Sequence, residues 1–266
     1  MSSRLTQCWN ALGEQTAFVP FIMAGHPHPD VTVDLLHALV KSGADVIELG
    51  VPFSDPMADG PTIEAAGHVA LSHGVSLAKV LSLVAEFRQT NGTTPIILMG
   101  YYNPIYRFGA EAFAQEAAKA GVDGCIVVDL PPEEMDELAP HLDAASIAPI
   151  MLATPTSDAE RLEKMRTYAK GHLYYVAVTG VTGSASADYS KLADQLTELR
   201  KVIDLPVTVG FGIKTPEDAK IVAALTEGVV VGSALVKVID ANKDQPTATL
   251  CEAVSTFSAS LASACK

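Results

Sequence analysis

The feature that most constrains the fold of this chain is the alternation of short apolar runs with longer amphipathic segments. Most of the runs lack a two-residue period, as strands buried on both faces do. A regular succession of such strands and helices is typical of βα units repeated around a parallel sheet. The eight runs lie at 17–25, 45–50, 95–101, 124–130, 148–154, 173–180, 205–212 and 228–234.

Helical patterns fill the intervals between these runs, with apolar residues three and four positions apart and several ends at glycine. The interval after the second run is longer than the others and leaves room for two helices. The clearest predicted helices lie within 31–44, about 61–73, about 76–91, 111–121, 158–171, 216–225 and about 247–264.

Eight strands with intervening helices favour a closed barrel. We predict a single (β/α)8 TIM barrel of the α/β class over residues 1–266, with extra helices after the second strand and at the C-terminus. No low-complexity linker or charge block divides the chain. An open doubly wound sheet is the alternative, but it usually has fewer strands and binds its ligand at one switch point.

The charge balance argues against two kinds of partner. Lys and Arg number 18 against 31 Asp and Glu, a net charge of -13 that opposes binding to nucleic acid or an anionic membrane. No apolar window predicts a signal peptide or membrane span. The cysteines form no CxxC pair and no metal-ligand spacing, so a reduced, cytoplasmic setting is expected; they are Cys8, Cys125, Cys251 and Cys265.

Glu48 is the first candidate for chemistry, because it stands between Ile47 and Leu49 in the second apolar run. Removing a carboxylate from water raises its pKa by up to ~3 to 5 units unless partners compensate. Such a group can donate and accept protons near neutral pH. A structural Glu held by a backbone donor or a tyrosine hydroxyl is an equally open interpretation.

The loop at 50–61 follows that strand and carries Asp55 and Asp59 among four residues that bend or restrict the chain, Pro52, Pro56, Gly60 and Pro61. Asp beside Pro and Gly is common in ordinary turns. Active sites of such barrels, however, are built from loops at the carboxyl ends of strands, where two carboxylates can converge on one ligand.

Asp129, at the end of the fourth run, is a further candidate at the carboxyl end of a strand. For this residue the capping of a neighbouring loop is the favoured interpretation over chemistry.

Glycines at or just after the ends of the last three runs favour a phosphate site. Barrels often bind phosphate between the loops after strands seven and eight, with helix amides facing the anion. No Walker-type GxxxxGK[ST] motif is present. The residues concerned are Thr182 and Gly183, Gly210 and Gly212, and Gly232 with Ser233.

Two other mechanisms find little support in the sequence. No lysine lies inside any of the eight runs, so a Schiff-base aldolase has no obvious nucleophile. His26 and His28 share one loop, but no third metal ligand is apparent, and we predict no metal site. The residues therefore indicate carboxylate acid-base catalysis on a phosphorylated ligand, without a cofactor bound to this chain.

The segment ELGVPFSDPMADGP, followed by GVTG, GFGI and GSALVK, resembles the tryptophan synthase alpha subunit family, and the resemblance runs along essentially the whole chain. The family is a single (β/α)8 barrel that cleaves indole-3-glycerol phosphate to indole and glyceraldehyde 3-phosphate. The resemblance implies that Glu48 is the proton shuttle and that Asp59 accepts a hydrogen bond from the indole N–H.

Other positions carry roles only through this resemblance. Phe21, Tyr101, Asp129, Tyr174 and Thr182 are implied to bind substrate, with plain core packing as the alternative for the aromatic residues. The residues implied to bind phosphate are Gly183, Gly212, Gly232 and Ser233. The segment after Gly183, SASADYS, carries less charge than the family leads us to expect.

The family works as an α2β2 complex with a beta subunit that holds pyridoxal phosphate. Pro52, Asp55 and Asn103 match positions that face this partner. Two other functions stay open on the sequence alone. One is a phosphosugar isomerase with the same phosphate site, and the other is a subunit that only activates its partner.

Overall fold

A computed structural model describes residues 3–177, 189, 191–210 and 212–266 of the chain. One sheet of nine strands dominates it, with the order β5-β4-β3-β2-β1-β9-β8-β7-β6 and every pairing parallel. The strands are β1 (Ala17–Met23), β2 (Ile47–Gly50), β3 (Ile96–Gly100), β4 (Gly124–Val127), β5 (Ala148–Pro149), β6 (Met151–Ala153), β7 (Leu173–Val176), β8 (Val207–Gly210) and β9 (Gly228–Val231).

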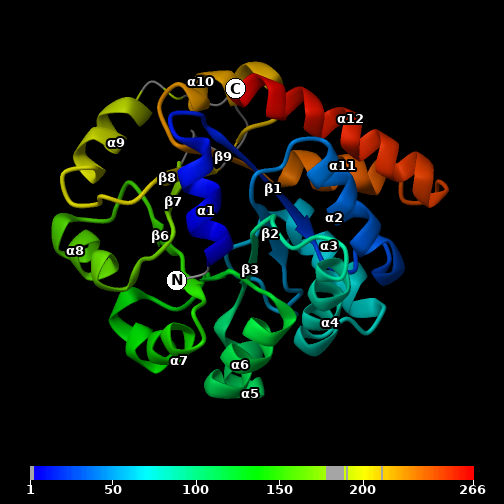
Figure 1. Cartoon of the computed structure of the whole chain (residues 1–266), viewed down its shortest axis with the longest axis horizontal. Coiled ribbons are helices and arrows are strands. Elements are labelled where there is room, and N and C mark those ends of the chain that lie inside the picture. Colours follow the sequence, from blue (N-terminus) through cyan, green and yellow to red (C-terminus); the bar gives the residue numbers. More distant parts are fainter. Residues whose placement is uncertain (1–2, 178–188, 190, 211) are drawn as a thin grey trace.

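The first and last strands of this order, β5 and β6, are separated in the chain by Ile150 alone. The Ile150 amide donates to the carbonyl oxygen of Cys125 in β4, at 2.9 Å. The predicted run at 148–154 therefore forms both strands and closes the sheet, so the TIM-barrel fold class is confirmed (Figure 1).

The helices surround the strands (Figure 1). Both helices predicted after β2 and the C-terminal helix are present, and α12 packs against α2 and α10. The helices are α1 (Ser3–Leu12), α2 (Thr32–Lys41), α3 (Pro61–Ser72), α4 (Leu77–Arg88), α5 (Tyr102–Phe108), α6 (Ala110–Ala120), α7 (Ala139–Ala144), α8 (Ala159–Tyr168), α9 (Leu192–Leu199), α10 (Pro216–Ala223), α11 (Ser233–Ala241) and α12 (Thr247–Cys265), with 3-10 turns η1 (Pro29–Val31) and η2 (Pro132–Glu137).

Helix α1, which the sequence analysis did not predict, lies across one end of the barrel (Figure 1). Leu5 is fully buried and belongs to the same apolar cluster as Ala17 and Val46, which lie at the N-terminal ends of the first two strands. Trp9 packs against this cluster as well. Helix α1 therefore covers the N-terminal end of the barrel, and the opposite end is left for a site.

Among the described residues, no single helix is long and apolar enough to cross a membrane. Only α3 and α4 taken together, bent by 93°, reach that length and composition.

The inside of the barrel is filled at its middle and accessible at its C-terminal end. Val46, Ile97, Ile126 and Ile150 form a buried inner cluster. Every second residue of a strand faces the same side, and the next inward positions, at or just beyond the ends of three neighbouring strands, carry apolar side chains that are only partly buried. These residues are Met99, Val128 and Leu152.

Candidate active site

Glu48 lies on β2, where its Cα pairs with Phe21 of β1 and Ile97 of β3. Its side chain is fully buried, and neither carboxylate oxygen has a hydrogen-bond partner among the described residues. Burial raises the pKa of Glu48 to about 8. The backbone or tyrosine partner that a purely structural role requires is thus missing from this part of the chain, and the carboxyl group can exchange a proton near neutral pH.

Tyr174 of β7 shares this interior with Glu48. Burial raises the Tyr174 pKa well above its usual value, and the negative charge of Glu48 raises it further. The Tyr174 hydroxyl lies directly over Gly210 of β8, since a Cβ atom on Gly210 would stand 1.9 Å from Tyr174 Oη. Because Gly210 has no side chain, the Tyr174 hydroxyl can occupy this position.

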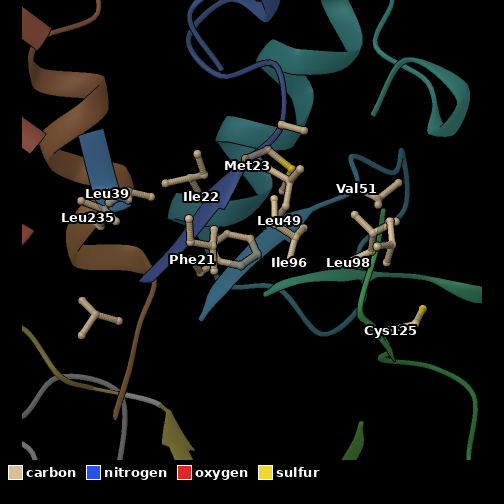
Figure 2. Packing of buried hydrophobic residues seen from close by; sticks show 14 of the residues in the cluster. Phe21, Ile22, Met23, Leu39, Leu49, Val51, Ile96, Leu98, Cys125 and Leu235 are labelled. Carbon is tan, nitrogen blue, oxygen red and sulfur yellow. The ribbon is translucent and has the colours of Figure 1, made fainter. Parts of the chain in front are cut away.

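Phe21 extends from β1 across the neighbouring strand (Figure 2). A Cβ atom on Gly50 of β2 would lie 2.6 Å from Phe21 Cζ, and one on Gly232 would lie 3.6 Å from Phe21 Cβ. The Phe21 side chain therefore lies between the strand that carries Glu48 and the residue that precedes α11.

The apolar side chains Met99, Val128 and Leu152 complete the accessible end of the barrel and were missed by the sequence analysis. The apolar runs have no two-residue period, so their inward positions could not be read from composition. The structure supplies what was missing, because the register that pairs Glu48 with Ile97 puts Met99 two residues further along the same face of β3.

The loop between β2 and α3 is attached to the end of β3. The backbone amide of Ala58 donates to the hydroxyl of Tyr101 at 3.1 Å, and the Tyr101 ring packs on Phe53 with centroids 5.3 Å apart. Burial raises the pKa of partly buried Asp59, while a hydrogen bond from Tyr101 lowers it and Glu64 raises it. Asp59 is thereby held at the C-terminal ends of β2 and β3, the end that the apolar side chains leave accessible.

Helix α11 begins directly after β9, and Gly232 is its N-cap with no side-chain hydrogen bond. Ser233 is the first helical residue and is exposed. The first amides of a helix have no intrahelical acceptor, so they can bind an anion. Gly212, after β8, has a φ of 80°, a backbone conformation that side chains disfavour.

Asp129 follows β4 and is exposed. Its Oδ1 accepts a hydrogen bond from the backbone amide of Tyr102, the first residue of α5, at 2.7 Å. This is the capping role favoured by the sequence analysis. Contact between Asp129 and a substrate stays a prediction.

A sequence model of the family described as "Tryptophan synthase alpha chain" matches residues 10–265. The tryptophan synthase alpha chain of Cupriavidus pinatubonensis is 49% identical over 261 residues, 97% of each chain. That of Marinobacter nauticus is 49% identical over 248 residues, 92% of each chain. The chain belongs to the tryptophan synthase alpha chain family.

Solved structures agree with this membership in the tryptophan synthase alpha chain family. Tryptophan synthase subunit alpha from Legionella pneumophila superposes with a TM-score of 0.92 at 41% identity, covering 99% of this chain and 98% of that chain. A chain of tryptophan synthase from M. tuberculosis in its aminoacrylate-bound form gives a TM-score of 0.87 at 30% identity, with 100% of both chains covered.

Of the residues that the resemblance to tryptophan synthase alpha chains places at a partner, two are exposed. Asp55 lies in the loop after β2 and Asn103 in α5, whereas Pro52 is buried. Two of the most exposed large apolar side chains stand on the same two segments, Met57 at 84% and Tyr106 at 69% exposure.

Some predicted positions lie elsewhere. Thr182 and Gly183, the expected loop contacts of the family, are outside the described residues.

His26 is buried with Nε2 3.6 Å from Asp240, while His28 stacks edge-on against His73. Among the described residues, no group of three or more His, Cys, Asp and Glu side chains is arranged to hold a metal ion.

Proposed function

We propose that this member of the tryptophan synthase alpha chain family acts as a lyase in tryptophan biosynthesis. It cleaves indole-3-glycerol phosphate to indole and glyceraldehyde 3-phosphate. The observation that carries the proposal is Glu48, a buried carboxyl group with a pKa of about 8 on the inner face of β2. A carboxyl group tuned in this way serves as both acid and base.

Glu48 acts as the proton shuttle of this retro-aldol cleavage. It takes the proton from the side-chain hydroxyl as that oxygen becomes the aldehyde of glyceraldehyde 3-phosphate. Before that, Glu48 protonates the ring carbon, which gives the ring a positive charge. The bond between this carbon and the side chain then breaks, and its electron pair neutralises the ring. One proton leaves the substrate and one returns, so Glu48 ends the cycle in its starting state.

Asp59 accepts a hydrogen bond from the indole N–H while the ring gains positive character. A fixed anion near a developing positive charge stabilises the transition state, and such preorganised groups are typically worth ~10² or more in rate. The hydrogen bond from Tyr101 supports this role, because it favours the ionised form of Asp59.

The remaining parts of the substrate match the other side chains. The flat apolar indole ring fits beside Phe21, Met99, Val128 and Leu152, with Tyr174 behind it near Glu48. The phosphate binds the first amides of α11 at Gly232 and Ser233, together with Gly212. Thr182 and Gly183 join this proposal through the family resemblance alone. The proposed reaction runs on side chains of this chain and takes place in the cytoplasm.

Incubation of the chain with indole-3-glycerol phosphate, with and without the beta subunit, tests this function. We expect indole and glyceraldehyde 3-phosphate in equal amounts, and no product in either condition would refute the proposal. A ring-opened sugar phosphate that raises the Tm more than the indole substrate would favour an isomerase instead. Equal indole release by the wild type and by Glu48→Gln would rule out Glu48 as the shuttle.

Family membership also implies a beta-subunit partner. We propose an α2β2 complex in which the partner holds pyridoxal phosphate and meets this chain at Asp55, Asn103, Met57 and Tyr106, with buried Pro52 shaping the loop beneath.

Charge replacement at an exposed apolar residue of an interface weakens association. Tyr106→Glu therefore lowers the affinity for the beta subunit in a titration, whereas Ile221→Glu does not, since Ile221 lies on α10, across the barrel from α5 (Figure 1). Equal effects of the two variants would contradict this placement.

A further inference from the structure

The hydroxyl of Tyr101 joins the loop at 51–60 to the end of β3. Tyr101 lies one residue beyond β3 and is 3% exposed. Its oxygen accepts the hydrogen bond of the Ala58 amide, at 3.1 Å. The hydroxyl also acts on the next residue, since it lowers the pKa of the Asp59 carboxyl group. Ala58 and Asp59 are consecutive residues, so one hydroxyl fixes the backbone and the acidic side chain of the same short segment.

The ring of Tyr101 makes a separate contact with this loop. Its centroid lies 5.3 Å from that of Phe53, and the two rings are inclined by 31°. Around them the loop is open to solvent, since Ser54, Asp55 and Met57 are exposed. The aromatic contact depends on the ring alone, so removal of the hydroxyl leaves it in place and separates the two contributions.

We propose that Tyr101 is a positioning residue for Asp59, whose carboxylate it holds at the accessible end of the barrel through its hydroxyl group. This inference rests on the role proposed above for Asp59, and it gives Tyr101 a task other than the substrate contact expected from the sequence. If the exposed loop were not anchored, it would have to become ordered in each catalytic cycle. Because it is anchored, the Asp59 carboxylate is already in the position that stabilises the transition state.

The same hydroxyl acts on the charge of Asp59. Burial and the nearby carboxylate of Glu64 both raise the Asp59 pKa, and the hydrogen bond from Tyr101 opposes them. A hydrogen bond donated to a carboxylate favours its ionised form, so loss of the hydroxyl raises the Asp59 pKa further. Tyr101 thus holds the Asp59 segment in place and favours the ionised form of its carboxyl group.

The test compares Tyr101→Phe with Tyr102→Phe in the full-length chain. The Tyr102 hydroxyl donates to Glu137 at 2.9 Å and so provides a matched control on the neighbouring residue. The first measurement is the Asp59 pKa, followed through the carbon-13 resonance of the Asp59 carboxyl group. This resonance is assigned by its disappearance in Asp59→Asn. The second measurement is the kcat and KM of indole release.

We expect Tyr101→Phe to raise the Asp59 pKa and to lower kcat by about 10- to 100-fold, the range for loss of one hydrogen bond to a charged group, with little change in KM. Tyr102→Phe changes neither quantity. An unchanged Asp59 pKa in Tyr101→Phe, or an equal loss of kcat in both variants, would overturn the inference. Wild-type turnover by Asp59→Asn would instead refute the proposed function, while the carboxyl resonance still decides whether Tyr101 acts on Asp59.

Discussion

At the scale of single residues, burial of the Glu48 carboxyl group lowers the free energy of unfolding, and the fold does not require it. The pKa of this buried carboxyl group is raised from 4.5 to about 8, so the unfolded chain releases the proton at lower pH than the folded chain does. Its contribution to stability is therefore full below the unfolded pKa and is lost as the pH rises from 4.5 to about 8.

Glu48→Gln keeps the shape of the side chain and removes this ionisation. At about 1.36 kcal/mol per pKa unit, we expect its free energy of unfolding to gain roughly 4 kcal/mol over the wild type between about pH 5 and pH 9. Urea unfolding at both pH values measures the difference. A gap that stays constant with pH would mean that Glu48 is not buried as a neutral acid.

Gly210 is a second residue whose identity follows from its neighbour. A methyl group there would lie 1.9 Å from Tyr174 Oη, so Gly210→Ala has to displace Tyr174 from its place near Glu48. Misplacement by about 1 Å can cost roughly 100-fold in rate, which is the loss of kcat we expect. Gly67→Ala is the control, because its Cβ meets Met23 Cε at an ordinary 3.7 Å within α3. Similar kcat values for the two variants would contradict the argument.

At the scale of elements, the helix start after β9 carries the proposed phosphate site. A Cβ atom on Gly232 meets Phe21 no closer than 3.6 Å, so Gly232→Ala leaves the free protein unstrained. It adds a methyl group at the N-cap of α11, next to the amides that we propose bind the phosphate. We expect an unchanged Tm without ligand, together with loss of most of the Tm increase caused by glycerol 3-phosphate. A full increase would place the phosphate elsewhere.

Gly92→Ala is the matched control for that experiment, since beyond its chain neighbours no atom of the described residues lies within 4 Å of its Cβ position. It should respond to glycerol 3-phosphate as the wild type does.

The sequence predicted the strands and the long helices well because their signals are local. Buried parallel strands are apolar runs, and α3, α4 and α12 repeat apolar residues at helical spacing. The split of one run at Ile150 and the short helix α5 were not predictable in this way, since closure of the barrel and the cap from Asp129 depend on residues distant in the chain. Glu48 was identifiable as a carboxylate in an apolar run, whereas the attachment of Asp59 to Tyr101 needed the structure.

At the scale of the whole molecule, α1 closes the barrel over a buried histidine. His172 is fully buried, its ring nitrogens have no partner among the described residues, and its ring lies edge-on to Trp9 with centroids 5.4 Å apart. Burial lowers the His172 pKa from 6.5 to about 3. Between these pH values His172 is protonated in the unfolded chain but not in the folded chain. The free energy of unfolding therefore falls as the pH drops from 6.5 towards 3.

His172→Phe keeps an aromatic ring against Trp9 without the ionisation. We expect the wild type to lose about 2 kcal/mol more than this variant between about pH 7.5 and pH 5, from 1.36 kcal/mol per pKa unit. Equilibrium unfolding in urea at the two pH values measures the difference. An equal loss in both proteins would show that His172 does not limit acid stability.

The central claim is that a buried carboxyl group at β2 moves the protons of the cleavage reaction. Its most direct test is the rate of indole release from saturating indole-3-glycerol phosphate by Glu48→Gln, with the Tm increase caused by the substrate showing that binding is retained. We predict a loss of about 10² to 10⁴ in kcat, the contribution of one general acid-base group, with an undiminished Tm increase. A variant that binds the substrate and turns it over within a few-fold of the wild type would contradict the account.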